Sequence, residues 1–192
     1  MTRIEIVPYR PEWPDEFALI GQELRNHLGD WAIRIDHIGS TSVPGLSAKD
    51  IIDIQITVDD FDDDRMAARF EDLAYTYQPH LVVDHEPPGR TIPVEELEKR
   101  MVKPPATQRP TNVHIRRKGS FNQRYALLFR DYLRTYPEAA AAYGHIKAVL
   151  SDKFPIDIES YYDVKDPVID VIMAGAWEWA DRVSWAFGPS DA

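Results

Sequence analysis

A single charged residue, Asp53, interrupts the otherwise uncharged run IIDIQI. Its neighbours are Ile51, Ile52, Ile54 and Ile56, and this β-branched composition predicts a strand that is buried on at least one face. A carboxylate in such a place costs free energy unless it is paired, hydrogen-bonded or bound to a metal ion. The sequence therefore indicates Asp53 as a candidate catalytic and metal-binding residue.

A turn rich in small residues and hydroxyls precedes this strand. Gly39, Ser40, Thr41 and Ser42 follow the short run 33–38. Glycine gives the turn a flexible backbone, and the N–H groups of such a turn could hold an anion. If the fold brings the turn and the carboxylate of Asp53 together, the two make a phosphate and metal site.

The spacing of these two features resembles a known signature. The letters IGS at 38–40, a gap of twelve residues, and DIQI at 53–56 are similar to the nucleotidyltransferase signature of the polymerase-β-like superfamily. That signature reads hydrophobic-Gly-[Gly/Ser], a gap of about this size, then Asp-hydrophobic-[Asp/Glu]-hydrophobic. The resemblance implies a fold that binds a nucleoside triphosphate.

A longer set of motifs resembles the GrpB family, and it spans residues 7 to about 170. The motifs are HIGSTSVPGLSAKDIIDI at 37–54, PYRPEWPDEF at 8–17, FRDYLR at 129–134, the pair Tyr143 and Lys147, and YYDVK at 161–165. The resemblance implies an α+β, nucleotidyltransferase-like fold with a small mixed β-sheet packed with helices.

The metal chemistry that this resemblance implies is altered at two positions. In the superfamily the Asp-x-Asp/Glu pair holds two divalent cations, whereas this chain has Gln55, whose amide oxygen is a neutral ligand. Asp53 and Gln55 share one side of a strand. A third ligand comes from a later strand, for which 112–116 is the candidate, and there His114 offers an imidazole, which favours zinc, copper or nickel over magnesium. We expect Mg²⁺ at Asp53, with slow one-metal chemistry or none.

Several basic and aromatic residues could contact phosphate groups. Seven basic residues and no acidic one lie between Lys99 and Lys118, a strip that suits a small anionic ligand or is simply a solvated loop. Each candidate also has a structural interpretation: a solvated lysine, an ion pair or helix packing. The predicted nucleotide- or phosphate-binding residues are Gly39, Ser40, Thr41, Lys49, Arg116, Arg130, Tyr143 and Lys147.

Composition limits the classes of protein to be considered. The chain has 192 residues, of which 44% are hydrophobic, a formal net charge of −10 and no cysteine, so we expect one domain, 1–192, without disulfides or thiolate chemistry. The negative charge argues against extended nucleic acid as a partner. The start MTRIEIVPYR has no apolar signal region, and no apolar run approaches the roughly 20 residues of a membrane span. We therefore expect a cytoplasmic protein without membrane contact.

Periodicity and turn residues predict the elements that position these side chains. Helices are expected at 13–28, after the aspartates at 59–64, at 95–101, at 120–135 with Ser120 as its cap, from Pro137, and at 163–187; strands are expected at 31–38, 80–84 and 112–116. Arg130 and Asp131 are neighbours on a helix, so we expect no salt bridge between them.

Three functions remain open at this level. The first is nucleotidyl transfer from a magnesium-bound nucleoside triphosphate to an acceptor. The second is a non-catalytic module that binds a nucleotide or a coenzyme A-related ligand and acts through a protein partner. For this, the resemblance adds that members of the family occur fused to dephospho-coenzyme A kinase. The third is a metal-dependent hydrolase using His37, Asp53 and His114.

Overall fold

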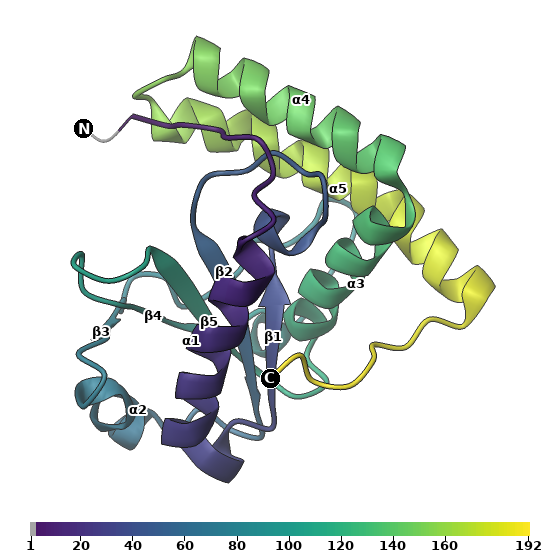
Figure 1. Cartoon of the computed structure of the whole chain (residues 1–192). Helices are drawn as coiled ribbons and strands as arrows, with labels where there is room; N and C mark the ends of the chain where they lie inside the picture. Colours follow the sequence, from purple (N-terminus) through teal and green to yellow (C-terminus); the bar gives the residue numbers. More distant parts are fainter. Residues whose placement is uncertain (1–2) are drawn as a thin grey trace.

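A mixed five-stranded sheet with the strand order β1-β2-β5-β4-β3 forms the centre of the molecule (Figure 1). The computed structural model describes residues 3–192, apart from the side chains of Asp63 and Asp64. The strands are β1 (Arg34–Ile38), β2 (Ile52–Val58), β3 (Thr76–Tyr77), β4 (Arg100–Lys103) and β5 (Thr111–Arg117). The predicted α+β class is confirmed.

The register of β2 and β5 places the sequence motifs opposite each other. These two strands run parallel, and Asp53 pairs with Asn112 while Gln55 pairs with His114. β1 pairs with β2 in the antiparallel sense, as does β4 with β5 and β3 with β4. The prediction that 112–116 is a strand beside the Asp53 strand is therefore confirmed.

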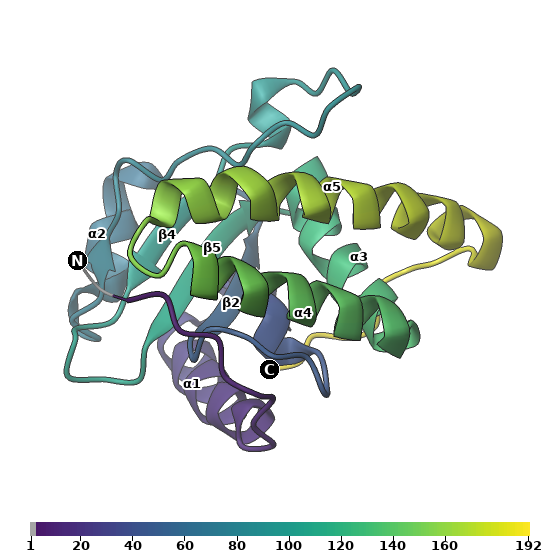
Figure 2. The ribbon, with the colours of Figure 1, turned by 90° about the horizontal axis from the view of Figure 1, so that it is seen from above.

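Helices cover both faces of the sheet. They are α1 (Trp13–Leu28), α2 (Asp63–Glu71), α3 (Phe121–Thr135), α4 (Pro137–Lys153) and α5 (Ile158–Val183), with short 3₁₀ turns at Gly29–Trp31, Ser40–Ser42 and Val94–Glu96. α1 contacts β1 and β2, and α3 contacts β1 and β5. α4 and α5 lie side by side and both contact α3 (Figure 2).

Alternation along β2 divides its side chains between two environments. Ile52, Ile54 and Ile56 are fully buried in a core that includes Trp13 and Phe17 of α1. Because successive side chains of a strand point to opposite faces, Asp53 and Gln55 face the side of α3, α4 and α5. A second core joins those three helices to the segment after β1.

Several predicted elements differ from the structure. Residues 80–84 form no strand: Val83 makes only an isolated bridge to Glu98, because the proline-containing loop 85–93 interrupts the pairing. The segment 95–101 is not a helix but a 3₁₀ turn followed by β4, since pairing with β5 outweighs the local preference. No helix among residues 3–192 combines the length and apolar character needed to cross a membrane.

The ends and contacts of the last helices also correct the sequence predictions. α5 begins at Ile158, because the side chain of Asp157 accepts a hydrogen bond from the Ser160 N–H. Ser120 precedes α3, but its Oγ lies 2.7 Å from the Arg117 carbonyl oxygen and 2.8 Å from Oδ1 of Asn122, two acceptors for its one proton, and it does not cap the helix.

Candidate functional site

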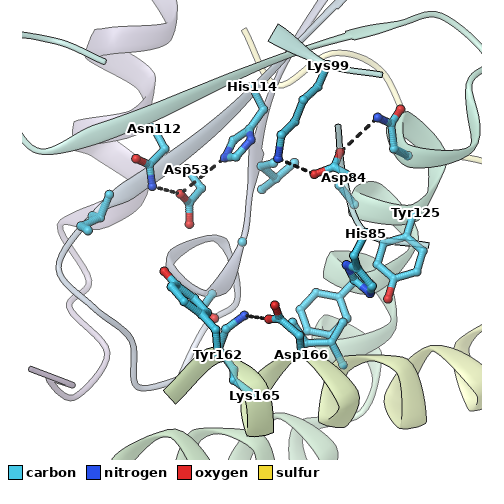
Figure 3. Close-up of a pocket in the computed structure, with 18 of the residues that line it drawn as sticks. Asp53, Asp84, His85, Lys99, Asn112, His114, Tyr125, Tyr162, Lys165 and Asp166 are labelled. Carbon is cyan, nitrogen blue, oxygen red and sulfur yellow. Dashed lines mark hydrogen bonds and ion pairs between the residues drawn. The ribbon is translucent and has the colours of Figure 1, made fainter. Parts of the chain in front are cut away.

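A cavity of about 730 Å³ lies between two parts of the molecule. One is the face of β2 and β5 that carries Asp53 and His114, and the other is the group of helices α3, α4 and α5. Its lining combines the turn after β1 with residues from β2, β4, β5 and the three helices. Figure 3 shows Asp53, Asn112 and His114 on the sheet side, with Tyr162 and Lys165 of α5 opposite them. The fold thus gathers segments from across the chain around one space.

The turn after β1 brings Gly39 and Ser40 against Asp53. Gly39 has a φ of 68°, a left-handed conformation that favours glycine. A Cβ atom at this position would also collide with the Asp53 carboxylate. Behind the turn, Thr41 is buried and its Oγ1 lies 3.0 Å from Nε2 of His37. The fold therefore brings the turn and the carboxylate together, which was the condition for a phosphate and metal site.

The Asp53 carboxylate has neutral neighbours on the sheet. Nδ2 of Asn112 donates a hydrogen bond of 2.8 Å to Oδ1 of Asp53, and Nε2 of His114 lies 4.0 Å from the same oxygen. Burial raises the pKa of Asp53, and the Asn112 hydrogen bond opposes this. The carboxylate would therefore gain from a bound cation, which favours its ionised form.

Gln55 lies under the cavity and does not line it. Its Nε2 donates to the carbonyl of Gln123 (3.2 Å), and its Oε1 accepts a hydrogen bond of 2.7 Å from Arg116. The side chain is fully buried. The expected role of Gln55 as a second metal ligand does not fit this arrangement, because its only good ligand atom faces a guanidinium.

Arg116 is held by a second carboxylate, Asp84. Arg116 contacts Asp84 through Nε and through a terminal nitrogen, both at 2.9 Å, and Lys99 donates to Asp84 at 2.6 Å. Burial raises the pKa of Asp84, but Arg116 and Lys99 outweigh it and hold that pKa well below its usual range. Arg116, predicted as a phosphate contact, lines the cavity, yet its charge is already paired.

His114 is neutral in this environment. Burial is the largest cause that lowers its pKa well below the ordinary value, followed by the charges of Arg116 and Lys99. Its buried Nδ1 has no hydrogen-bond partner among the residues that the structure describes. His114 can therefore accept or donate a hydrogen bond to a ligand, but two cations close by oppose metal binding.

Lys147, predicted with Tyr143 as a nucleotide or phosphate contact, reaches the turn from α4. Its Nζ donates to Oγ of Ser40 (2.8 Å) and to the carbonyl of Ser47 (2.6 Å), and it lies 4.6 Å from the centre of the Tyr143 ring. Burial, with the charge of Lys165 next, lowers the pKa of Lys147 to about 7. Tyr143 itself is buried and also lines the cavity.

Lys49 lies among aromatic rings at the other end of the turn. Its Nζ is 4.7 Å from the ring centres of both Tyr161 and Tyr162 and donates to the Tyr162 hydroxyl at 3.2 Å. Burial lowers its pKa, and Lys165 adds to the effect. Lys165 in turn contacts Asp166 at 2.6 Å. The turn, Lys147, Lys49 and Lys165 form a cationic side of the cavity.

Arg130, predicted as a phosphate contact, lies elsewhere. Its guanidinium donates to the carboxylates of Asp131 and Asp191, both at 2.7 Å, and to the carbonyl of His37 at 3.1 Å. The Asp131 contact corrects the expectation that these neighbours do not pair, because the long arginine chain folds back to reach the next residue. Arg130 is not among the residues that line the cavity.

Asp84, Tyr162, Lys165 and Asp166 line the cavity although the sequence did not point to them, and Lys99, noted only as part of a basic strip, lines it as well. Tyr162 and Lys165 belong to the noted motif YYDVK, but the predicted helix began at 163. A helix beginning earlier would have placed them on one face at a spacing of three. Asp84 and Lys99 meet only through tertiary contacts, for which the sequence carries no local signal.

The residues predicted to bind a metal ion do not come together as a metal centre with several carboxylates. Within residues 3–192, apart from the two undescribed side chains, no group of three or more His, Cys, Asp or Glu residues could hold a metal ion. His37 stacks on Phe17 with ring centres 4.7 Å apart and is not part of the cavity lining. The predicted set of His37, Asp53 and His114 for a hydrolase is therefore wrong.

The α+β fold is shared with solved structures of low sequence identity. A GLD-2/RNP-8 complex structure is similar at a TM-score of 0.51 and 12% identity, covering 96% of this chain and 63% of that chain, which bears on the fold alone. The sequence model described as "GrpB protein" matches residues 3–175. The chain belongs to the GrpB family. The crystal structure of GrpB from Enterococcus faecalis is similar at a TM-score of 0.75 and 30% identity, covering 91% of this chain and 98% of that one.

Curated relatives fall into two groups. A dephospho-CoA kinase of Mycolicibacterium paratuberculosis is 36% identical over 195 residues, which covers 95% of this chain and 48% of the relative. A UPF0157 protein of Halalkalibacterium halodurans is 34% identical over 176 residues, covering 90% of this chain and 82% of the relative. The chain therefore spans about half the length of the dephospho-CoA kinases that it matches.

Proposed function

We propose that this protein binds a nucleotide or a nucleotide-containing small molecule in the cavity between the sheet and α3–α5. The observation that carries the proposal is the charge of the lining: six cationic side chains face three carboxylates, in a chain whose formal net charge is −10. The cationic residues are Lys49, Lys99, Lys103, Arg116, Lys147 and Lys165. A positive cavity in an acidic protein attracts a small anion and disfavours an extended polyanion.

The distribution of charge supports phosphate binding at one side of the cavity. Lys99 and Arg116 are paired with Asp84, so they contribute little free positive charge. Among the residues that the structure describes, Lys49 contacts two rings and a hydroxyl, and Lys147 contacts neutral oxygens and a ring. Phosphate groups beside the Gly39–Ser40 turn would therefore meet Lys49 and Lys147, and charge-assisted hydrogen bonds of this kind are strong. Lys165 also lines the cavity, where it contacts Asp166 at 2.6 Å.

The size and the aromatic lining of the cavity suit the part of the ligand that carries no phosphate. Small-molecule pockets have volumes of about 300–1,000 Å³, and this cavity has about 730 Å³. The rings of Tyr161, Tyr162 and Tyr125 line it, and such rings offer flat surfaces for a base or another planar group. Because several relatives are named dephospho-CoA kinase, coenzyme A precursors belong among the candidate ligands.

Magnesium fits this site only as an ion that the ligand carries. Mg²⁺ is commonly bound by one or two carboxylates together with substrate phosphates, and Asp53 is the carboxylate beside the turn. A second protein ligand is not supplied by Gln55, whose oxygen faces Arg116. The site therefore supports ligand binding better than two-metal nucleotidyl transfer.

The proposal is tested by the melting temperature of the purified chain with nucleoside mono-, di- and triphosphates and with coenzyme A precursors, each with and without Mg²⁺. A ligand at 100 times its Kd stabilises the folded state by about 2.7 kcal/mol. We expect at least one of these compounds to raise the melting temperature in a saturable manner. Losing one charge-assisted contact, worth about 1.5–3 kcal/mol, should weaken binding tenfold or more in Lys49→Ala.

Lys153→Ala is the matched control, because Lys153 is an exposed lysine near the end of α4. It should bind as the unaltered chain does. If no ligand of the panel shifts the melting temperature at millimolar concentration, or if both lysine variants bind equally well, the proposal is wrong.

A further inference from the structure

The contact between Ser40 and Lys147 has the geometry of a nucleophile beside its base. The amine and the hydroxyl are 2.8 Å apart, within the distance at which a proton is transferred directly. Ser40 is partly exposed and lines the cavity, whereas Lys147 is only 3% exposed. A ligand in the cavity can therefore reach the hydroxyl while the amine stays shielded from water.

The surroundings of Lys147 allow its amine to be neutral. Both of its hydrogen bonds go to neutral oxygens, those of Ser40 and Ser47. Burial lowers its pKa to about 7, the charges of Lys165 and Lys49 act in the same direction, and Asp53 opposes them. A neutral amine can donate to the Ser47 carbonyl and still offer its lone pair to the Ser40 hydroxyl.

The backbone fixes the hydroxyl in place. Gly39, with its φ of 68°, precedes Ser40 directly, and Ser42 Oγ donates to the Gly39 carbonyl at 2.6 Å. The Ser47 carbonyl holds the amine from the same segment of chain. Both partners are therefore positioned by contacts that do not depend on a ligand, which is the arrangement that efficient proton transfer requires.

We propose that Ser40 is a nucleophile activated by Lys147 and that the pair hydrolyses a phosphomonoester bound in the cavity. The inference rests on the proposed function, because the substrate is a phosphorylated ligand of the same site. Lys49 and Lys165 share the cavity with the pair, and positive charges positioned beforehand stabilise the charge that develops on a transferring phosphoryl group.

The reaction proceeds in two balanced steps. In the first, Ser40 Oγ forms a bond to phosphorus as the bond from phosphorus to the ester oxygen breaks, and Lys147 moves the serine proton to the leaving alcohol. In the second, water attacks the phosphoserine and gives a proton to Lys147. The bond from phosphorus to Oγ then breaks, Oγ takes that proton, and inorganic phosphate leaves.

A simpler role for the pair makes a different prediction. If Lys147 only binds phosphate, a permanent cation of similar length at this position should preserve both ligand binding and turnover. Lys147→Arg tests this, because arginine keeps the charge but is effectively always protonated. Under the proposal this variant retains ligand binding and loses turnover.

The experiment measures phosphate release from p-nitrophenyl phosphate and from nucleoside 5′-monophosphates, with intact mass of the quenched protein to detect a phosphoryl group on Ser40. We expect release that Ser40→Ala abolishes and that Lys147→Arg and Lys147→Met lower by about 10²-fold or more, the usual contribution of a general base. The kcat/KM should rise with pH through about 7, where Lys147 loses its proton in the free protein. Ser151→Ala, which alters a buried serine on the same helix, should behave as the unaltered chain.

The outcomes separate the two proposals. Circular dichroism of each variant first establishes that it is folded. Phosphate release that survives in Ser40→Ala, or no release and no phosphoserine while ligands still raise the melting temperature, overturns the nucleophile and leaves the binding site standing. If ligands neither raise the melting temperature nor are hydrolysed, both proposals fall.

Discussion

Gln55 links the sheet to α3 and orients Arg116 beneath the cavity. Its two polar atoms contact the Gln123 carbonyl and the Arg116 guanidinium. The signature that this chain resembles has an acid at this position, and in such proteins the acid faces a metal ion. Here the side-chain oxygen at this position accepts from the Arg116 guanidinium, and the amide nitrogen donates to the Gln123 carbonyl.

Gln55→Glu should therefore not create a metal-dependent enzyme. The new carboxylate would pair with Arg116 but would place an oxygen against the Gln123 carbonyl, so we expect destabilisation of about 1–3 kcal/mol, the cost of an unsatisfied buried polar group. Urea denaturation measures this cost. An assay of nucleotidyl transfer with Mg²⁺ tests whether the variant gains activity.

Gln22→Glu makes the same chemical change on the exposed side of α1 and should alter stability by less than about 0.5 kcal/mol. Magnesium-dependent nucleotidyl transfer appearing in Gln55→Glu would show that the acid reaches a metal ion after all. That result would contradict the structural role assigned to Gln55.

At the scale of elements, Asp50 joins α1 to the segments before β2 and β5. Its carboxylate accepts hydrogen bonds from the indole of Trp13 (2.8 Å), from Arg10 (2.7 Å) and from Arg109. Trp13 is the first residue of α1 and is completely buried. One side chain therefore holds the start of the helix against the sheet.

Replacing Asp50 by alanine should lower the free energy of unfolding by about 2 kcal/mol at neutral pH, because a buried indole N–H loses its acceptor. Burial raises the pKa of Asp50, but the hydrogen bonds from Trp13 and Arg109 outweigh it, so the pKa is lowered. A lowered carboxyl pKa stabilises the folded state above the ordinary value of 3.8, and this stabilisation disappears as the pH falls below it.

The difference in the free energy of unfolding between the unaltered chain and Asp50→Ala should thus shrink on acidification. Denaturation at several pH values would reveal this. Glu12→Ala is the control, since Glu12 is exposed and its contact with Arg10 is a long 3.8 Å. A difference that stayed constant down to low pH would show that Asp50 acts by packing and not through its charge.

Elements with strong periodicity were predictable, and those defined by pairing were not. α1, β2, β5 and α3 follow from apolar spacing and from the residues at their ends, and the resemblance to known motifs gave the turn, Asp53 and Lys147. β4 owes its existence to β5, which its own sequence does not reveal. The ion pairs of Arg116 and Arg130 likewise depend on which distant carboxylates the fold brings near, so both residues were assigned to phosphate binding.

At the scale of the whole molecule, the cavity is built from segments that lie far apart in the chain. The turn after β1 contributes Ser40, α4 contributes Lys147, and α5 contributes Tyr162 and Lys165, the last two of which are labelled in Figure 3. The overall negative charge repels polyanions, while the cationic lining attracts small ones. The arrangement therefore selects a ligand by both charge and size.

The most direct test is a crystal structure of this chain grown with the ligand of the panel that raises its melting temperature most. The account predicts phosphate density beside Ser40, within hydrogen-bonding distance of Lys147 and of Lys49 or Lys165, with the remainder of the ligand against the tyrosines of α5. Ligand density outside the cavity, or a saturated protein whose cavity holds no phosphate, would contradict it.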